Sequence, residues 1–143
     1  MRILALDVGT KTIGVAVSDE LGITANGVAT LRRKDIEHDM AELGRIIERY
    51  SPSELLVGVP YRSDGSVGKR GEEIMRFAGI LKDAFNIPVT YWDESFSTAD
   101  AERFLIGADV GRKKRKKVID KMAAVYILAE YLESKRSQKK GDQ

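Results

Sequence analysis

The 143-residue sequence contains no cysteine, a single histidine and only three prolines. Without cysteine the chain can form neither a disulfide framework nor a thiolate metal site, which is compatible with a reducing compartment. The N-terminus, Met1-Arg2-Ile3, carries no signal-peptide pattern. No apolar run approaches the ~18 residues of a transmembrane helix. We therefore expect a soluble, cytoplasmic protein with no membrane partner.

The sequence also lacks a large net charge, because 24 basic residues face 22 acidic ones and leave a balance of +2. The basic residues are unevenly spread. An unbroken basic run occupies residues 112–117, and further lysines and arginine occur near the C-terminus. With 43% hydrophobic residues the chain can bury a core, and its length fits one domain of roughly 100–200 residues. We predict a single domain over residues 1–135 and a disordered basic tail over 136–143.

Hydrophobic periodicity predicts the order β-β-β-α-β-α-β-α-α. Such an order indicates an α/β protein with a mixed five-stranded sheet and helices on both faces. The predicted strands cover residues 3–7, 12–19, 22–32, 55–59 and 88–92. The predicted helices cover residues 36–50, the region of 74–85, 97–106 and 118–134. Residues 61–71, which are rich in glycine, and the basic run 112–117 are predicted as loops.

Three carboxylates lie where a buried charge would need a partner. Asp7 ends the first apolar run, and Glu94 follows the last predicted strand. Asp120 shares a helical stripe with Ala124, Ile127 and Tyr131, which should face the sheet. Two of the acids also have a purely structural interpretation, Glu94 as a helix-capping residue and Asp120 as a first-turn acid paired with Lys117 or Lys121. Asp93, beside Glu94, should point to the opposite face of the strand.

Taken together, the three carboxylates are more specific. Two acids at the ends of strands and one on a packed helix can meet at one edge of an open sheet, where α/β proteins bind ligands. Clustered carboxylates repel one another unless a cation binds, and oxygen-only ligands favour Mg²⁺ or Mn²⁺. Such a site suits the attack of water on a phosphodiester.

Four segments carry a resemblance to a known family. They are Asp7-Val8-Gly9-Thr10-Lys11, Val57-Gly58-Val59-Pro60 with Asp64-Gly65, Asp93-Glu94-Ser95-Phe96-Ser97-Thr98, and Lys117-Val118-Ile119-Asp120-Lys121-Met122-Ala123-Ala124. In order and spacing, over about residues 2–133, they resemble the YqgF family, a Holliday-junction-resolvase-like group assigned to pre-16S rRNA nucleases. The resemblance implies a ribonuclease H-like fold, a divalent-metal site and a catalytic, metal-binding triad of Asp7, Glu94 and Asp120.

The sequence departs from the family pattern at two places. Ser95 stands where the family usually has arginine, which puts a phosphate or structural contact in doubt. Arg62-Ser63 precede Asp64-Gly65 where the family usually has Asn-Met. Neither departure removes an acid.

Basic residues indicate nucleic-acid contact, with RNA favoured and branched DNA as the alternative. The run 112–117 lies just before Asp120, and Lys11 lies in the turn after Asp7. The expected nucleic-acid contacts are Lys11, Arg112, Lys113, Lys114, Arg115, Lys116 and Lys117. The glycine-rich loop with Arg62, Lys69 and Arg70 could close over a substrate. The alternative is that the run and the loop are simply solvated.

Three other functions compete with an RNA nuclease. Actin-like ATPases and sugar kinases share the strand-Asp-x-Gly-Thr turn, but they need two such domains and this chain has room for one. A non-catalytic RNA-binding assembly factor could keep the fold without using the acids. A resolvase of four-way DNA junctions would be expected to dimerise. We expect a monomer or a weak homodimer.

Overall fold

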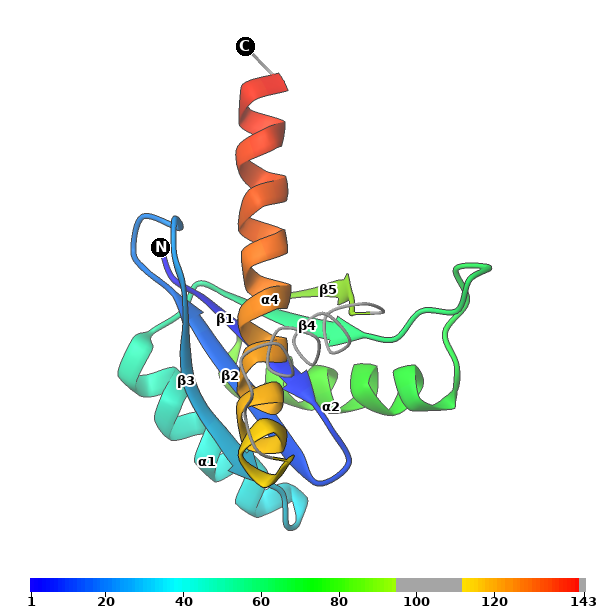
Figure 1. Ribbon diagram of the computed structural model, residues 1–143. Coiled ribbons are helices and arrows are strands. Elements are labelled where there is room, and N and C mark those ends of the chain that lie inside the picture. The colour runs from blue at the N-terminus through cyan, green and yellow to red at the C-terminus, as the bar shows by residue number, and fades with distance from the viewer. Residues whose placement is uncertain (95–111, 142–143) are drawn as a thin grey trace.

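The computed structural model describes the backbone of residues 1–94 and 112–141, and the side chains of 1–94 and 122–138 (Figure 1). Three strands open the chain, and helices and strands then alternate. The strands are β1 (Ile3–Val8), β2 (Thr12–Ser18), β3 (Ala25–Arg32), β4 (Glu54–Val59) and β5 (Val89–Asp93). The helices are α1 (Ile36–Tyr50), α2 (Lys69–Phe85) and α4 (Arg112–Gly141). The helix predicted over 97–106 lies outside the described residues.

The strands form one mixed sheet in the order β3-β2-β1-β4-β5. Strands β1, β2 and β3 form an antiparallel meander, and β1, β4 and β5 run parallel to one another. The carboxyl ends of β1, β4 and β5 therefore meet at the same edge. This arrangement confirms the predicted mixed five-stranded sheet.

Alternation along β1 divides the core into two layers. Leu4, Leu6 and Val8 pack with residues of α1 and α2 on one face. Ile3 and Ala5 pack with α4 on the other. Helices therefore cover both faces of the sheet, as predicted (Figure 1).

Two predicted boundaries were wrong for the same physical reason. The basic run 112–117 is helical, so α4 begins at Arg112 instead of residue 118, and it continues to Gly141 instead of ending at residue 134. Lysine and arginine are good helix formers, and residues 112–140 contain no glycine or proline to interrupt the helix. Charge alone was therefore a poor indication of a loop or a tail.

Two glycines mark the other corrected boundaries. Helix α2 begins at Lys69 after Gly68 as its N-cap, so the predicted loop 61–71 is shorter. Strand β3 begins at Ala25 instead of residue 22, because Gly22 adopts a φ of 69° in the turn after β2. The side chain of Asp19 closes this turn by accepting a hydrogen bond from the backbone N–H of Ile23.

Polar contacts anchor α4 to the beginning of β4. Glu54 accepts hydrogen bonds from Thr90 on β5 and from Tyr131 on α4, and it forms an ion pair with Lys135 at 3.4 Å. Burial raises the pKa of Tyr131, and its hydrogen bond to Glu54 raises it further. Glu54 therefore holds β5 and α4 together at the start of β4.

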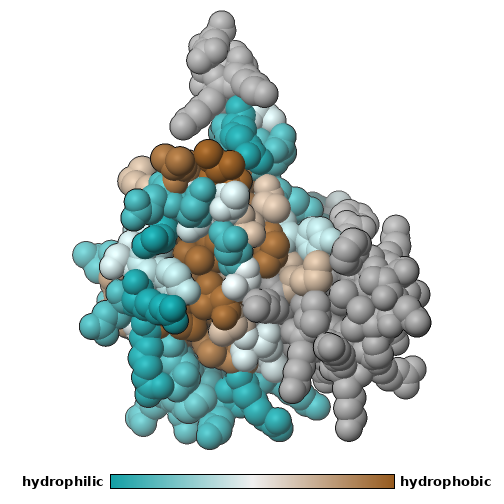
Figure 2. All heavy atoms as spheres, turned by 60° about the vertical axis from the view of Figure 1, so that its left-hand side comes forward, coloured by the Kyte–Doolittle hydropathy of each residue, from teal (hydrophilic) through white to brown (hydrophobic). Residues whose placement is uncertain are grey.

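The end of α4 extends beyond the sheet (Figure 1). Leu132 is the last buried residue of the helix among its described side chains. Hydrophobic side chains gather below this projecting end (Figure 2), and Met1, Leu21 and Ile23 are among the exposed large hydrophobic residues. Within the described residues, no helix is long and apolar enough to cross a membrane.

Candidate metal and nucleic-acid site

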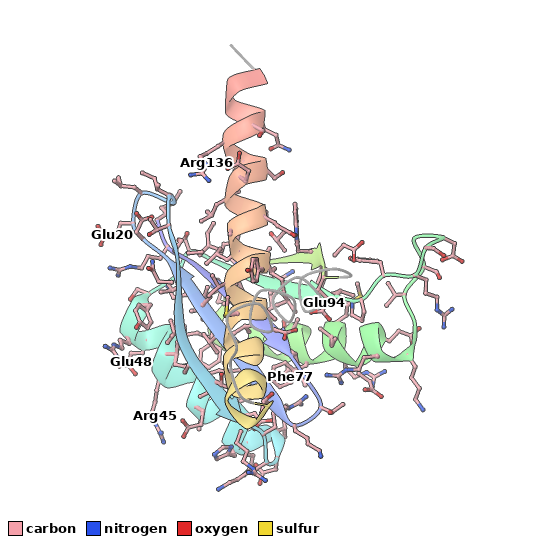
Figure 3. The ribbon with its side chains drawn as sticks, in the orientation of Figure 1. Glu20, Arg45, Glu48, Phe77, Glu94 and Arg136 are labelled. Carbon is pink, nitrogen blue, oxygen red and sulfur yellow. The ribbon has the colours of Figure 1, made fainter. Side chains whose placement is uncertain are left out.

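Asp7 and Glu94 meet at the edge where the parallel strands end. Asp7 lies near the end of β1, and Glu94 directly follows β5. The backbone N–H of Glu94 donates to the carbonyl of Val59 at 3.2 Å, which holds residue 94 beside the end of β4. Figure 3 shows Glu94 beside α4 at this edge of the sheet. The structure therefore brings together two of the three predicted acids.

Gly58 on β4 leaves the space that the Glu94 side chain fills. A Cβ atom at position 58 would lie 2.7 Å from Oε2 of Glu94 and 2.6 Å from Cδ1 of Ile127 on α4. Real Cβ contacts are essentially never this short. A methyl group at position 58 would therefore make the Glu94 and Ile127 side chains shift, and glycine lets both approach β4 this closely. An isolated glycine in a predicted buried strand is the sequence signal for such an approach.

The Glu94 carboxyl is held in an unfavourable environment for a charge. Burial raises its pKa to about 9, and two further causes are a hydrogen bond from the protonated Glu94 to the Asp7 carboxylate and repulsion by the Asp7 charge, while the Arg70 charge acts in the opposite direction. Among the described residues, Oε2 of Glu94 is buried and has no hydrogen-bond partner. Without a cation, this pair of acids therefore favours keeping a proton on Glu94.

The donor set suits a hard divalent cation. Two carboxyl groups face each other, and one oxygen is buried and unsatisfied among the described residues. A cation between them would satisfy this oxygen and remove the repulsion. Oxygen donors without nitrogen or sulfur favour Mg²⁺ or Mn²⁺. No group of three or more metal-binding side chains exists within the described residues, which exclude the side chain of Asp120.

Asp120 lies on the backbone of α4 in the part that approaches this edge. It is one helical turn before Ala124 and about two turns before Ile127, and both of these residues are buried against the sheet. Cδ1 of Ile127 lies close to Gly58, only 2.6 Å from where a Cβ atom at that position would be. The backbone of α4 thus keeps Asp120 in line with the residues that pack beside Glu94, although its side chain lies outside the described part.

Two arginines hold the turn that follows Asp7, and sequence reasoning missed this role for both. Arg33 donates to the carbonyl of Gly9 at 2.7 Å, and Arg70 donates to the carbonyl of Val8 at 2.5 Å. Arg33 is itself fixed by the buried carboxylate of Asp39, at 3.1 Å. Burial raises the pKa of Asp39, but hydrogen bonds from the Lys34 backbone, Arg33 and His38 outweigh it and lower the pKa overall.

The remaining predicted contacts are distributed over several elements. Lys11 is exposed in the β1–β2 turn, and Arg62 is exposed in a tight turn closed by a bridge between Tyr61 and Val67. Lys69 and Arg70 belong to the first turn of α2 and not to a loop. Residues 112–117 form the start of α4. Arg70 contacts the strand end that carries Asp7, because it donates to the carbonyl of Val8.

A family model described as "RuvX: Holliday junction resolvase" matches residues 1–134. The chain belongs to the RuvX family. Proteins named "Putative pre-16S rRNA nuclease" are among its relatives. The one from Desulforamulus reducens is 54% identical over 134 residues, which cover 94% of this chain and 98% of the relative. The one from Bacillus subtilis is 51% identical over 136 residues, which cover 94% and 99%. The resemblance of the sequence motifs to the YqgF family is therefore confirmed, since RuvX and YqgF name the same family.

Solved resolvases share the fold of this RuvX-family chain. T. thermophilus RuvC in complex with Holliday junction substrate has a TM-score of 0.59 at 12% identity, covering 95% of this chain and 96% of that one. The fowlpox virus resolvase with Holliday junction DNA has a TM-score of 0.59 at 16% identity, covering 94% and 98%. These likenesses confirm the predicted ribonuclease H-like fold.

Replacing Gly58 should displace the side chain of Glu94. Gly58→Ala should destabilise the protein by about 1–3 kcal/mol, because the new methyl group overlaps Glu94 and Ile127. Gly79→Ala is the matched control, since a Cβ there meets nothing within 4 Å, and it should be neutral or stabilising by up to about 1 kcal/mol. Urea unfolding measures both. Equal stabilities for the two variants would contradict the close approach at Gly58.

The acid pair should make stability depend on pH when divalent metal is absent. The folded-state pKa of Glu94 lies at about 9, above the ordinary value of 4.5, so the folded protein retains a proton that the unfolded chain releases. The contribution of Glu94 is complete below pH 4.5 and is lost as the pH rises to about 9. Urea unfolding in EDTA across this window should show the decline, and Glu94→Gln should flatten it. An equal decline in both proteins would contradict the assignment to Glu94.

Proposed function

We propose that the protein is a metal-dependent nuclease that hydrolyses phosphodiester bonds in the cytoplasm, in processing the 5′ end of pre-16S rRNA. One observation carries the proposal. The carboxyl groups of Asp7 and Glu94 lie together at the edge of the sheet, with a buried oxygen that has no partner among the described residues. Membership of a family of resolvases, with relatives named as nucleases, supports the same chemistry.

In this proposal Asp7, Glu94 and Asp120 hold one or more Mg²⁺ or Mn²⁺ ions. When bound, such ions polarise the attacking water and stabilise the leaving oxygen of an in-line displacement. The protein's part is to hold the carboxylates in position. Gly58 admits the Glu94 side chain, and Arg33 and Arg70 hold the turn after Asp7. Oε2 of Glu94 is buried away from bulk water, which strengthens its interaction with a cation.

RNA is the favoured substrate because the curated relatives are named for a precursor rRNA. The second candidate is a four-way DNA junction, and the description of the family model favours it. The two substrates imply different assemblies. A two-fold symmetric junction suits a symmetric dimer, whereas an RNA strand can be cut by a monomer or a weak homodimer. A non-catalytic RNA-binding assembly factor is the alternative outside the enzymes.

The start of α4 provides the proposed contact with the phosphate backbone. Residues 112–117 are consecutive basic residues on the helix that carries Asp120. A strand held there would pass close to the acids, because Asp120 follows within one turn. Lys11, exposed in the turn after Asp7, is a further proposed contact.

Cleavage should depend on each of the three acids. Asp7→Asn, Glu94→Gln and Asp120→Asn should each lower the rate by at least the ~10–100-fold that losing an outer-shell partner of a metal ligand typically costs. The assay compares precursor rRNA, single-stranded RNA and junction DNA with Mg²⁺ or Mn²⁺. Asp93→Asn is the matched control, since Asp93 is exposed beside Glu94, and it should retain activity. Wild-type rates in all three acid variants would make the site assignment wrong. A cellular role that survives Asp7→Asn would favour the assembly factor.

The basic run should set the salt dependence of binding. Changing Arg115, Lys116 and Lys117 to alanine should weaken RNA binding and reduce the slope of log K against log salt by about 2, at roughly 0.7 for each single-strand phosphate contact. The control removes the same charge by changing the exposed residues Arg45, Arg49 and Lys82 on α1 and α2. An unchanged slope in the first variant would make the run a solvated helix end.

A further inference from the structure

A second polar feature lies at the end of β1, on the opposite face of the strand from the carboxylates. A cavity of about 420 Å³ opens between the β1–β2 turn, the β3–α1 connection and the first turns of α2. It is lined by Val8, Thr10, Arg33, Lys34, Arg70 and Glu73. The side chain of Val8 packs on the face of α1 and α2, whereas Ile3 and Ala5, on the other face of β1, pack against α4. Alternation puts Asp7 on the α4 face, so the cavity and the acid flank the same strand end.

The lining carries an excess of positive charge. Three of its side chains are cationic, and Glu73 is its single acid. Glu73 is already engaged by Arg70 at 3.3 Å. Lys34 is exposed, and its ammonium group forms no ion pair with the described residues. The cavity therefore offers donors and net positive charge to an anion.

The arginine donors are held in place before any ligand arrives. Nε of Arg33 pairs with the buried Asp39 at 3.1 Å, Nη1 donates to Gly9, and the guanidinium stacks over the ring of Phe77 at 4.9 Å. A guanidinium has five N–H donors, so these bonds leave others for a ligand. Arg70 is likewise fixed by Val8 and Glu73. Fixed donors bind an anion without the ordering cost that flexible side chains incur.

We propose that this cavity is a phosphate-binding subsite, which takes a backbone phosphate of the nucleic-acid strand at some distance from the bond that is cut. The identity of the ligand as a nucleic acid rests on the proposed function. The inference adds the path that the nucleic-acid strand takes over the protein. The volume lies in the range of small-molecule sites, so it has room for a phosphate group. A strand that crosses the edge of the sheet at Asp7 would reach Arg33, Lys34 and Arg70 on the other side.

Arg70 connects the subsite to the carboxylates. It lines the cavity and donates to the carbonyl of Val8, the residue after Asp7. A phosphate bound by Arg70 would thus be held against the strand end that carries the acid. The subsite would fix the register of the strand, because phosphate contacts position a nucleic acid without reading its sequence.

The test is the salt dependence of binding by the full-length protein, measured in EDTA so that no cleavage is needed. The probes are labelled single-stranded RNA and DNA oligonucleotides of the same length. Lys34→Ala removes one lining cation and keeps the backbone N–H that bonds to Asp39. It should raise Kd and reduce the salt slope by about 0.7, the value for one phosphate contact on a single strand. Lys34→Glu should weaken binding further, and Lys34→Arg should restore the wild-type slope.

Lys82→Ala is the matched control, because Lys82 is exposed in the last turn of α2 and away from the cavity. It should leave Kd and slope unchanged. A reduced slope for Lys34→Ala with either oligonucleotide supports the subsite, whichever nucleic acid is the natural substrate. A wild-type slope with both overturns it, as does an equal loss in Lys82→Ala. No cleavage by the wild-type protein, or wild-type rates in all three acid variants, would count against the proposed function and leave this binding result standing.

Discussion

The repulsion between Asp7 and Glu94 is the constraint on which the rest of the site depends. Two carboxyl groups meet in a partly buried space, and the pKa of Glu94 rises through burial and through the neighbouring acid. A fold that had only to be stable would separate them. Instead, the parallel arrangement of β1, β4 and β5 carries both acids to one edge, and a glycine in β4 makes room for the second. Without a cation Glu94 keeps a proton, and a divalent cation would offset the cost of ionising both acids.

A second set of contacts holds Asp7 in position. Arg33 and Arg70 come from different parts of the chain and donate to the successive carbonyl groups of Gly9 and Val8, directly after Asp7. Asp39, buried under Arg33, supports one of these arginines. Buried polar residues of this kind are costly unless they are fully hydrogen-bonded. Their presence beside the β1–β2 turn indicates that a fixed position of the turn is worth that cost.

Local patterns in the sequence were sufficient for most of the fold. Helical periodicity predicted residues 36–50 as a helix, and the structure has α1 at Ile36–Tyr50. The alternation and the short apolar runs predicted all five strands to within a few residues. The pattern failed at the start of α4, because six consecutive lysines and arginines carry no apolar stripe by which a helix could be predicted.

The site was only partly predictable. Asp7 and Glu94 were visible as acids at strand ends, and their meeting followed from the expected topology. The roles of Gly58, Arg33 and Asp39 depend on contacts between residues that are far apart along the chain. Arg33 and Gly9 are 24 residues apart, and Arg70 and Val8 are 62 apart. No local pattern encodes such pairs. A single glycine or a charged residue near a helix start has too many ordinary explanations for sequence alone to select one.

The anchor at Glu54 has a consequence for how substitutions in this protein are interpreted. Glu54 binds β5 and α4 at the end of the sheet opposite to the carboxylates, and those two elements lead to Glu94 and Asp120. Glu54 is thus a shared attachment point for the two elements that lead to Glu94 and Asp120. A loss of activity in variants of Glu54, Thr90 or Tyr131 would reflect a change in the position of β5 or α4, because these residues lie at the end of the sheet away from the acids.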